Sequence, residues 1–199
     1  MMLYSVIIPH KNAVDLLGRL IQSIPRRPDL EILVVDDSSS AQELKKLVLL
    51  QEKEGFSLYV NSGGAGAGGS RNVGLTHARG EFVLFADADD FFNSTLAHEL
   101  DHIPSYNRDL LFYQVDSVDS ETYVGSHRHL FFNALVQDYK GSGALDIIYK
   151  YSVPWGKVYR RSFLTAHGLR FAEVIAGNDM WFSCSCGIFQ SSFAVLETT

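Results

Sequence analysis

Three carboxylates lie within four positions of the chain, in the segment FADADDFF at residues 85–92. Asp87, Asp89 and Asp90 directly follow an apolar run. Two carboxylates about 5 Å apart repel each other by roughly 3 kcal/mol at an effective dielectric constant of 20. A divalent cation would offset this repulsion, and the cluster exceeds what the capping of a following helix needs, so the segment predicts a metal or ligand site.

The glycine-rich segment NSGGAGAGGSRNVG, residues 61–74, is a second candidate for ligand contact. It contains a G-x-G-x-x-G pattern beginning at Gly64, but the dinucleotide fingerprint opens a first strand–helix unit, and this segment opens the third. No G-K-[ST] follows, which excludes a P-loop, and a flexible linker is the plain alternative. Arg71 and Asn72 lie at an expected helix start, where anions bind well, so close approach of the backbone to a ligand is favoured.

Two further pairs of polar residues each have two interpretations. Asp36 and Asp37 follow an apolar run and either cap the next helix or contact a ligand. Asn178 and Asp179 precede an apolar helix and are either its plain N-terminus or part of a site. The residues alone leave both alternatives open.

Histidine and cysteine pairs give weaker signals. His127 and His129 would share one face of a strand and could ligate a metal, but no third ligand is in sequence reach, which favours ordinary surface histidines. Cys184 and Cys186 form a C-x-C pattern, which by itself indicates neither a zinc site nor a disulfide. We therefore expect a reduced, cytoplasmic protein.

Composition excludes several classes of function. The 199 residues have a net charge of −6, 46% hydrophobic and 20% charged residues, which is typical of a folded domain without a broad nucleic-acid-binding face. No segment approaches the ~20 apolar residues of a membrane span. The first residues lack the features of a signal peptide and indicate a strand.

The elements of the first half alternate. Asn12 is expected to cap a helix whose apolar face recurs at i, i+3 and i+4 up to Ile24. Ser40 and Glu43 predict a capping box for the next helix, and Arg71–Ala78 is expected to be a third. Strands are expected at Leu3–Ile8, Ile32–Val35, Phe56–Val60 and Glu81–Ala86. This order predicts a mostly parallel sheet with helices on both faces and a site beyond the carboxyl ends of its strands.

The second half is less regular. Two strands are expected, at Asp109–Val118 and Glu121–Gly125, as a hairpin. The remaining expected elements are helices at Phe131–Tyr139, Ala144–Tyr149 and Asp179–Ile188, followed by a strand at Ser192–Leu196.

Taken together, the motifs resemble the family 2 inverting glycosyltransferases with the GT-A fold. The resemblance rests on SVIIPHKN, VVDDSS, the G-x-S-R-N-x-G of residues 68–74, GEFVLFADADD, PWGKVYRRSFL and GLRFAE followed by ND. It runs from about Ser5 to about Phe182, with six motifs in the family's order. It implies an α/β fold of GT-A type, with a mostly parallel sheet, a Rossmann-like nucleotide-binding half and an acceptor-side half.

The resemblance also implies roles for individual residues. The nucleotide-sugar donor would lie along Pro9, Asp36 or Asp37, the glycine segment at Gly68, Arg71 and Asp87. Asp89 would hold Mn²⁺ or Mg²⁺, which acts as a Lewis acid on the leaving diphosphate. Asp179 would be the general base, and Asn178 stands where the family usually has Glu.

We therefore expect one GT-A domain over residues 1–199, with a donor half at about 1–92 and an acceptor half at about 93–199. The expected reaction is hexosyl or N-acetylhexosaminyl transfer from a nucleotide sugar, UDP-linked in most of the family, to a hydroxyl of a glycan or lipid-linked acceptor. The context would be cell-surface polysaccharide or glycolipid synthesis, in the cytoplasm or at the inner face of the membrane. Relatives usually continue past the strand expected at Ser192–Leu196, so part of the acceptor side or a membrane-associating tail is expected beyond residue 199.

Two alternatives remain beside this prediction. A degenerate relative would bind the nucleotide sugar without transfer. A nucleotidyltransferase would need a basic glycine-rich signature directly after the first strand, and Pro9-His10-Lys11-Asn12 is not one.

Overall fold

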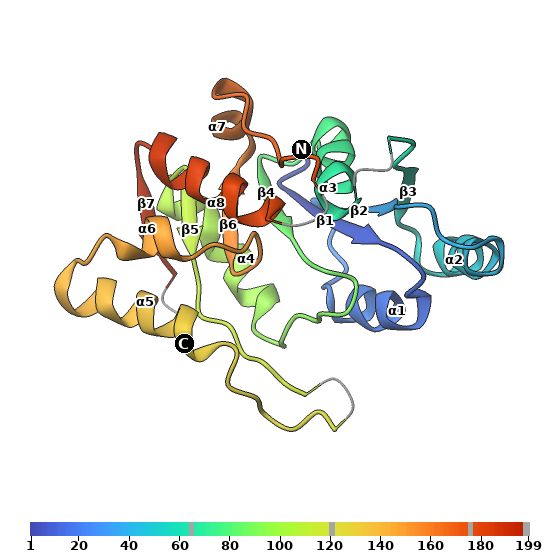
Figure 1. Cartoon of the computed structure of the whole chain (residues 1–199), viewed down its shortest axis with the longest axis horizontal. Helices are drawn as coiled ribbons and strands as arrows, with labels where there is room; N and C mark the ends of the chain where they lie inside the picture. Colours follow the sequence, from blue (N-terminus) through green and yellow to red (C-terminus); the bar gives the residue numbers. More distant parts are fainter. Residues whose placement is uncertain (64–65, 120–121, 175–176, 197–199) are drawn as a thin grey trace.

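A computed structural model describes residues 1–63, 66–119, 122–174 and 177–196. Within these residues seven strands form one sheet in the order β3-β2-β1-β4-β6-β5-β7 (Figure 1). The strands are β1 (Tyr4–His10), β2 (Leu30–Asp36), β3 (Ser57–Val60), β4 (Phe82–Phe85), β5 (Leu110–Phe112), β6 (Lys157–Arg160) and β7 (Phe193–Val195). The helices are α1 (Val14–Ser23), α2 (Ala41–Glu54), α3 (Gly66–His77), α4 (Leu96–Tyr106), α5 (Leu130–Ser142), α6 (Asp146–Lys150), α7 (Arg161–Ala166) and α8 (Asn178–Phe189).

The parallel part of the sheet confirms the prediction for the first half. β1 pairs in parallel with β2 and with β4, and β2 pairs in parallel with β3. Every residue of β1 is buried, because helices cover both faces of the sheet. Val6 packs into the cluster on one face, while its neighbour Ile7 packs into the cluster on the other.

The two faces carry different sets of helices. Residues of α1, α2 and α4 share one hydrophobic cluster with β1, and residues of α5, α6, α7 and α8 share the other. α3 lies against β1 on the side opposite α1 (Figure 1). A Cβ atom added at Gly74 would lie 2.4 Å from Ile7 Cγ2, so this close contact between α3 and β1 depends on glycine.

The second half differs most from its prediction. β6, which the sequence did not predict, lies between β4 and β5 and is antiparallel to both. The strand expected at Asp109–Val118 is shortened to β5. The strand expected at Glu121–Gly125 begins outside the described residues, and its end contributes an isolated bridge between Gly125 and Val118. We call residues 117–119 and 122–126 the arm; this segment extends away from the sheet (Figure 1).

Three helix starts also differ. α1 begins after Ala13 without a side-chain cap, so Asn12 is not its N-cap; Asn12 has φ of 51° and its Oδ1 accepts from the Ser40 amide at 2.8 Å. Ser40 does cap α2 through the Glu43 amide, but the Glu43 carboxylate reaches the Val14 amide of α1 and not back to Ser40. α3 begins at Gly66, so Arg71 lies inside the helix and not at its start.

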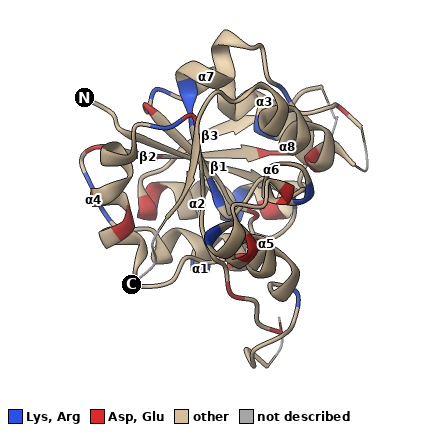
Figure 2. Ribbon diagram, turned by 90° about the vertical axis from the view of Figure 1, so that its left-hand side faces the viewer, with Lys and Arg blue, Asp and Glu red and all other residues tan. Residues whose placement is uncertain are grey.

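No helix in the described part of the chain has the length and apolar character needed to cross a bilayer. Lys and Arg residues are mixed with Asp and Glu residues along the ribbon in the view of Figure 2.

Candidate functional site

Arg71 is the centre of a charged cluster at the carboxyl end of β4. Its side chain is 2% exposed. One guanidinium nitrogen, Nη2, donates to Asp87, and the other, Nη1, donates to Asp179 Oδ1 at 2.7 Å and to Asn178 Oδ1 at 3.2 Å. The side chain thus joins the end of a sheet strand to the first turn of α8. One cation between two carboxylates leaves this cluster with a net negative charge.

The geometry of α3 and of the segment before α8 explains how these residues meet. The Asn72 side chain makes two hydrogen bonds with the main chain of Phe171. Its Nδ2 donates to the carbonyl oxygen and its Oδ1 accepts from the amide, each at 2.9 Å. The Arg71 guanidinium also lies 5.2 Å from the centre of the Phe171 ring, within the range of a cation–π contact. These contacts of Asn72 and Arg71 with Phe171 hold the chain so that Asp179 lies beside Arg71.

Gly68 makes that approach possible. A Cβ atom at this position would lie 2.6 Å from the Ala172 carbonyl oxygen and 3.1 Å from Asn178 Cβ. The predicted purpose of this glycine was close contact with a ligand. In the structure the space beside it is occupied by the segment that leads into α8.

Asp179 is a partly buried carboxylate in the first turn of α8. Its side chain is 37% exposed. Partial burial raises the pKa of Asp179, and the Asp87 charge adds to the rise, while Arg71 acts in the opposite direction. Burial therefore outweighs the favourable contact with Arg71 in its effect on this pKa. A carboxylate with a raised pKa is a stronger proton acceptor once it is ionised.

Asp36 is turned inward at the end of β2. The side chain is 1% exposed, and its oxygens accept from His10 Nδ1 at 2.9 Å and from the Ser39 amide at 3.0 Å. Burial acts to raise the pKa of Asp36, but the hydrogen bonds from Ser39 and His10 outweigh it and hold the pKa below its usual range. The Ala13 amide donates to His10 Nε2 at 3.2 Å, so the proton of the neutral ring lies on Nδ1.

Asp37 and Pro9 border the same edge of the sheet. Asn61 Nδ2 donates to Asp37 Oδ1 at 2.9 Å, and the exposed Lys11 ammonium lies 3.6 Å from the other oxygen. Pro9 is buried within β1 beside Val35 of β2. Of the two aspartates predicted to contact a base, Asp37 keeps the more accessible carboxylate, since Asp36 is occupied by protein groups.

The acidic turn, residues 87–91, directly follows β4. The Asp90 amide donates to the Asp87 carbonyl oxygen at 2.9 Å, which closes the turn. Desolvation, and then the charges of Asp87 and Asp89, raise the pKa of Asp90 to about 6. Asp89 is exposed, and its carboxylate has no hydrogen-bond or ion-pair partner among the described residues.

The predicted cation can be tested against this turn. In the described part of the chain, no group of three or more His, Cys, Asp or Glu side chains could hold a metal ion. Mg²⁺ and Mn²⁺ at nucleotide sites do not need such a cage, because one or two carboxylates and the substrate phosphates suffice. The exposed Asp89 carboxylate fits this kind of site.

Other predicted residues lie elsewhere or outside the description. His127 and His129 lie in the turn before α5 and not on a strand, and His129 Nδ1 lies 2.8 Å from Ser117 Oγ. Gly64 lies outside the described residues. The hydrogen bonds between Asn72 and the main chain of Phe171 were not predicted, because no local sequence pattern links a helical asparagine to a main chain 99 positions later.

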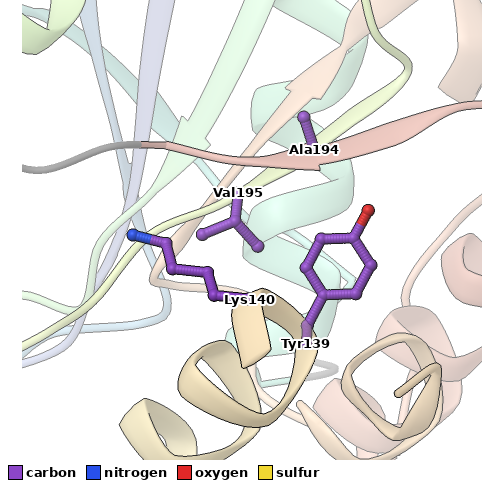
Figure 3. Close-up of a pocket in the computed structure, with 4 residues that line it drawn as sticks. All are labelled: Tyr139, Lys140, Ala194 and Val195. Carbon is purple, nitrogen blue, oxygen red and sulfur yellow. The ribbon is translucent and has the colours of Figure 1, made fainter. Parts of the chain in front are cut away.

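A hollow of the surface lies away from this cluster. It is lined by Tyr139 and Lys140 of α5 and by Ala194 and Val195 of β7 (Figure 3). β7 is separated from β4 by β6 and β5 in the sheet. The hollow therefore does not form part of the charged site.

Comparisons with known proteins agree with this geometry. The model of the family "Glycosyl transferase family 2" matches residues 5–168. Among curated proteins, the poly(ribitol-phosphate) beta-N-acetylglucosaminyltransferase TarS of Staphylococcus aureus is 29% identical over 206 residues, which cover 99% of this chain and 34% of TarS. The beta-1,3-glucosyltransferase WfgD of Escherichia coli, which acts with UDP-Glc on alpha-D-GlcNAc-diphosphoundecaprenol, is 26% identical over 73% of this chain and 59% of its own length.

Solved structures give the same result for the fold. The crystal structure of S. aureus TarS 1-349 in complex with UDP-GlcNAc is 26% identical, with a TM-score of 0.77, and the match covers 98% of this chain and 56% of that one. A mannosyltransferase from Pyrobaculum calidifontis, solved with GDP-Man and Mn²⁺, has a TM-score of 0.68 at 18% identity and shares the fold. The GT-A fold is therefore confirmed, and the chain spans about a third of TarS, or 34%.

Proposed function

Because the chain belongs to glycosyl transferase family 2, we propose that it is the catalytic part of a metal-dependent, inverting glycosyltransferase. The donor would be a UDP-linked hexose or N-acetylhexosamine. The observation that carries the proposal is the half-exposed Asp179 carboxylate, held by Arg71 beside the acidic turn at the carboxyl end of β4. In an open α/β sheet this end is where ligands bind.

Each residue has a role that its environment supports. Asp179 takes the proton of the acceptor hydroxyl while that oxygen attacks the anomeric carbon, since its raised pKa suits a base. Arg71 holds Asp179 and Asp87 in fixed positions, so that neither carboxylate is displaced by repulsion from the other. Asp87, which remains partly exposed, and Asp37, whose carboxylate is less enclosed than that of Asp36, would face the nucleotide.

The proposed cation site is Asp89. Its exposed carboxylate would hold Mn²⁺ or Mg²⁺ together with the donor diphosphate. A cation bound there supplies positive charge to the leaving diphosphate. Asp36 and Pro9, being buried, would border the donor through the main chain that they position and not through their side chains.

The acceptor is proposed from the relatives. TarS acts on poly(ribitol phosphate) and WfgD on a sugar linked to diphosphoundecaprenol. We propose a hydroxyl of a cell-surface polymer or of a lipid-linked glycan as the acceptor. Such an acceptor would bring the chain close to a membrane surface.

Titration with UDP tests the donor site. Wild-type protein should bind UDP weakly in chelator and much more tightly in Mn²⁺, and Asp89→Asn should abolish the difference. Asp138→Asn, on the exposed surface of α5, is the matched control and should behave as wild type. UDP affinity that does not respond to Mn²⁺ would overturn the metal assignment.

Hydrolysis of UDP-α-GlcNAc and UDP-α-glucose in Mn²⁺, followed by NMR, tests the reaction. An inverting enzyme with water as acceptor releases the β anomer first, before mutarotation. Initial release of the α anomer would contradict inversion. Tight UDP binding without turnover of either donor would favour the degenerate binding module.

A further inference from the structure

Arg19 on α1 connects two segments that lie far apart in the sequence. Its Nη2 donates to the main-chain carbonyl oxygen of Asp89, in the acidic turn, and its Nη1 donates to the Tyr123 hydroxyl, in the arm, at 2.9 Å. The same guanidinium lies 5.1 Å from the centre of the Phe91 ring and 5.4 Å from that of Tyr123. One cation is thus held between two aromatic rings while it donates to both segments.

The contact in the arm is made at a conformational cost. Tyr123 has φ of 57°, in the left-handed region that a bulky residue rarely adopts. Such a conformation is unfavourable by itself and persists where other contacts require it. The Tyr123 amide donates to the Asp119 carbonyl oxygen at 2.9 Å, so the main chain of Tyr123 is held within the arm while its side chain contacts Arg19.

The residue directly after the acidic turn is also held by α1. The Phe92 amide donates to Ser23 Oγ at 2.9 Å, and that hydroxyl donates to the Leu20 carbonyl oxygen at 2.6 Å. α1 therefore contacts the turn through Arg19 and its following residue through Ser23, and of these two hydrogen-bonding side chains only Arg19 also contacts the arm. Mutation of Ser23 should therefore affect only the region of the turn, whereas mutation of Arg19 should affect both the turn and the arm.

We propose that Arg19 is a positioning residue that couples the arm to the acidic turn. Its bond to the Asp89 carbonyl fixes the main chain from which the Asp89 carboxylate projects, and its contacts with Tyr123 fix the arm to the same point. Binding of a cation and nucleotide at Asp89 would then also order the arm, which belongs to the acceptor-side half. The part of this inference that concerns the cation rests on the proposed function, whereas the coupling itself does not.

Amide hydrogen exchange of the metal-free protein tests the coupling. The reporters are the hydrogen-bonded amides of Asp90 and Phe92 in and beside the turn and of Tyr123 and Ser126 in the arm. Arg19→Gln should speed exchange at both pairs by about tenfold, which corresponds to the loss of one charge-assisted hydrogen bond. Amides of β1 should not change, which shows that the variant is folded.

Two further variants separate the contacts. Ser23→Ala removes the acceptor of the Phe92 amide and should speed exchange in the region of the turn while leaving the arm unchanged. Tyr123→Phe keeps the ring on Arg19 and should speed exchange in the arm by less than Arg19→Gln does. An arm that exchanges at the wild-type rate in Arg19→Gln would overturn the coupling.

Added UDP and Mn²⁺ test the consequence for the site. In wild-type protein they should slow exchange at Tyr123 and Ser126, and in Arg19→Gln this slowing should be lost. If wild-type protein binds no UDP in Mn²⁺, the proposed function fails while the metal-free exchange still decides the coupling. If wild type binds UDP and its arm is unaffected, the link between the site and the arm is wrong.

Discussion

Arg71 donates to Asp179 at 2.7 Å although 108 positions separate the two residues in the sequence. The same guanidinium also donates to Asp87, so that a buried cation joins the proposed base to the end of β4, where the donor is proposed to bind. Arg71 therefore affects both the stability of the site and the pKa of Asp179.

Replacing Arg71 should therefore affect two separate measurements. Arg71→Ala should lower the free energy of unfolding by about 1.5–3 kcal/mol, because Asp87 and Asp179 lose a charge-assisted partner. It should also raise the pKa of Asp179 further, because the adjacent cation that opposes the rise is removed. Chemical denaturation and the pH dependence of turnover measure the two effects.

Arg71→Lys and Arg108→Ala complete this experiment. The lysine variant should recover part of the stability, since an ammonium cannot serve both carboxylates with a planar fork. Arg108 is exposed, and its guanidinium donates to the neighbouring Asn107 carbonyl oxygen, so its alanine variant should resemble wild type. An Arg71→Ala protein with unchanged stability and pH profile would show that the ion pairs contribute little.

Asp179→Asn should reduce sugar transfer by roughly 10²–10⁴, because the amide keeps the shape of the side chain and cannot accept the proton. UDP binding in Mn²⁺ should stay nearly unchanged, since the role belongs to the transition state. Transfer at the wild-type rate, or loss of UDP binding in its place, would remove Asp179 from the role of base.

The pH dependence of the wild-type rate follows from the same carboxylate. A base must be ionised, so the rate should fall as the pH falls through the pKa of Asp179. Because that pKa is raised, the fall should begin at a higher pH than for an ordinary aspartate. The measurement is the rate from pH 4 to 8 at saturating donor, compared with UDP affinity over the same range.

Gly68→Ala should destabilise the protein by about 1–3 kcal/mol, because the new methyl group would overlap the Ala172 carbonyl oxygen. Gly141→Ala is the matched control: a Cβ atom there meets nothing within 4 Å, and the change within α5 should stabilise by roughly 0.5–1 kcal/mol. Thermal unfolding of the two variants gives the comparison. A stable Gly68→Ala protein that has lost UDP affinity would restore the original interpretation, in which this glycine faces the ligand.

Lys157 should make stability rise with pH above neutrality. The side chain is 1% exposed, its Nζ donates to the Tyr151 carbonyl oxygen at 2.5 Å, and burial lowers the pKa of Lys157 to about 7. Between this value and the unfolded pKa near 10.4, the unfolded chain binds more protons, so unfolding becomes less favourable as pH rises. The slope from this group is at most about 1.4 kcal/mol per pH unit.

Comparison with Lys157→Met isolates that effect. Burial raises the pKa of Cys186 to about 12 and Lys157 acts to lower it, so loss of Lys157 would raise it further. In both folded proteins the thiol stays protonated below pH 9.5, so its opposing contribution cancels in the comparison over that range. The difference in unfolding free energy, wild type minus variant, should therefore rise between pH 7.5 and 9.5. A difference that is constant over this range would mean that Lys157 is not desolvated in the folded state.

The first half of the fold was predictable because each buried parallel strand is a short run of apolar residues with polar residues at its end. β6 was not, because KVYR contains two basic residues and no apolar run. Burial of Lys157 in the sheet is offset by the hydrogen bond from Nζ to the Tyr151 carbonyl oxygen. It is also offset by cation–π contacts of Nζ with the rings of Phe112 and Tyr151, whose centres are 5.4 Å and 5.1 Å away. These partners come from other elements, so local sequence carries no sign of them.

The candidate site was likewise predictable only in part from the sequence. Residue types predicted which side chains would gather at the strand ends, since Asp36, Asp87 and Arg71 do lie at this edge. Their contacts were not predictable, because Asp36 is satisfied by His10 and Ser39 and Arg71 by residues of α8. The helix starts at Gly66, which moves Arg71 away from an anion-binding terminus, and Gly68 of the same helix packs against Ala172 and Asn178, contacts that no local pattern indicates.

The place of β6 in the sheet has a consequence for synthesis of the chain. While the ribosome is still making the second half, β4 has β1 on one side and an unpaired row of main-chain groups on the other, since its second neighbour contains Tyr159 and Arg160. An open edge of an apolar strand such as Phe82–Phe85 is a template for pairing with other chains. The nascent protein should therefore depend on chaperones, or on rapid translation through residue 160, and a fragment that ends near residue 92 should aggregate where the whole chain does not.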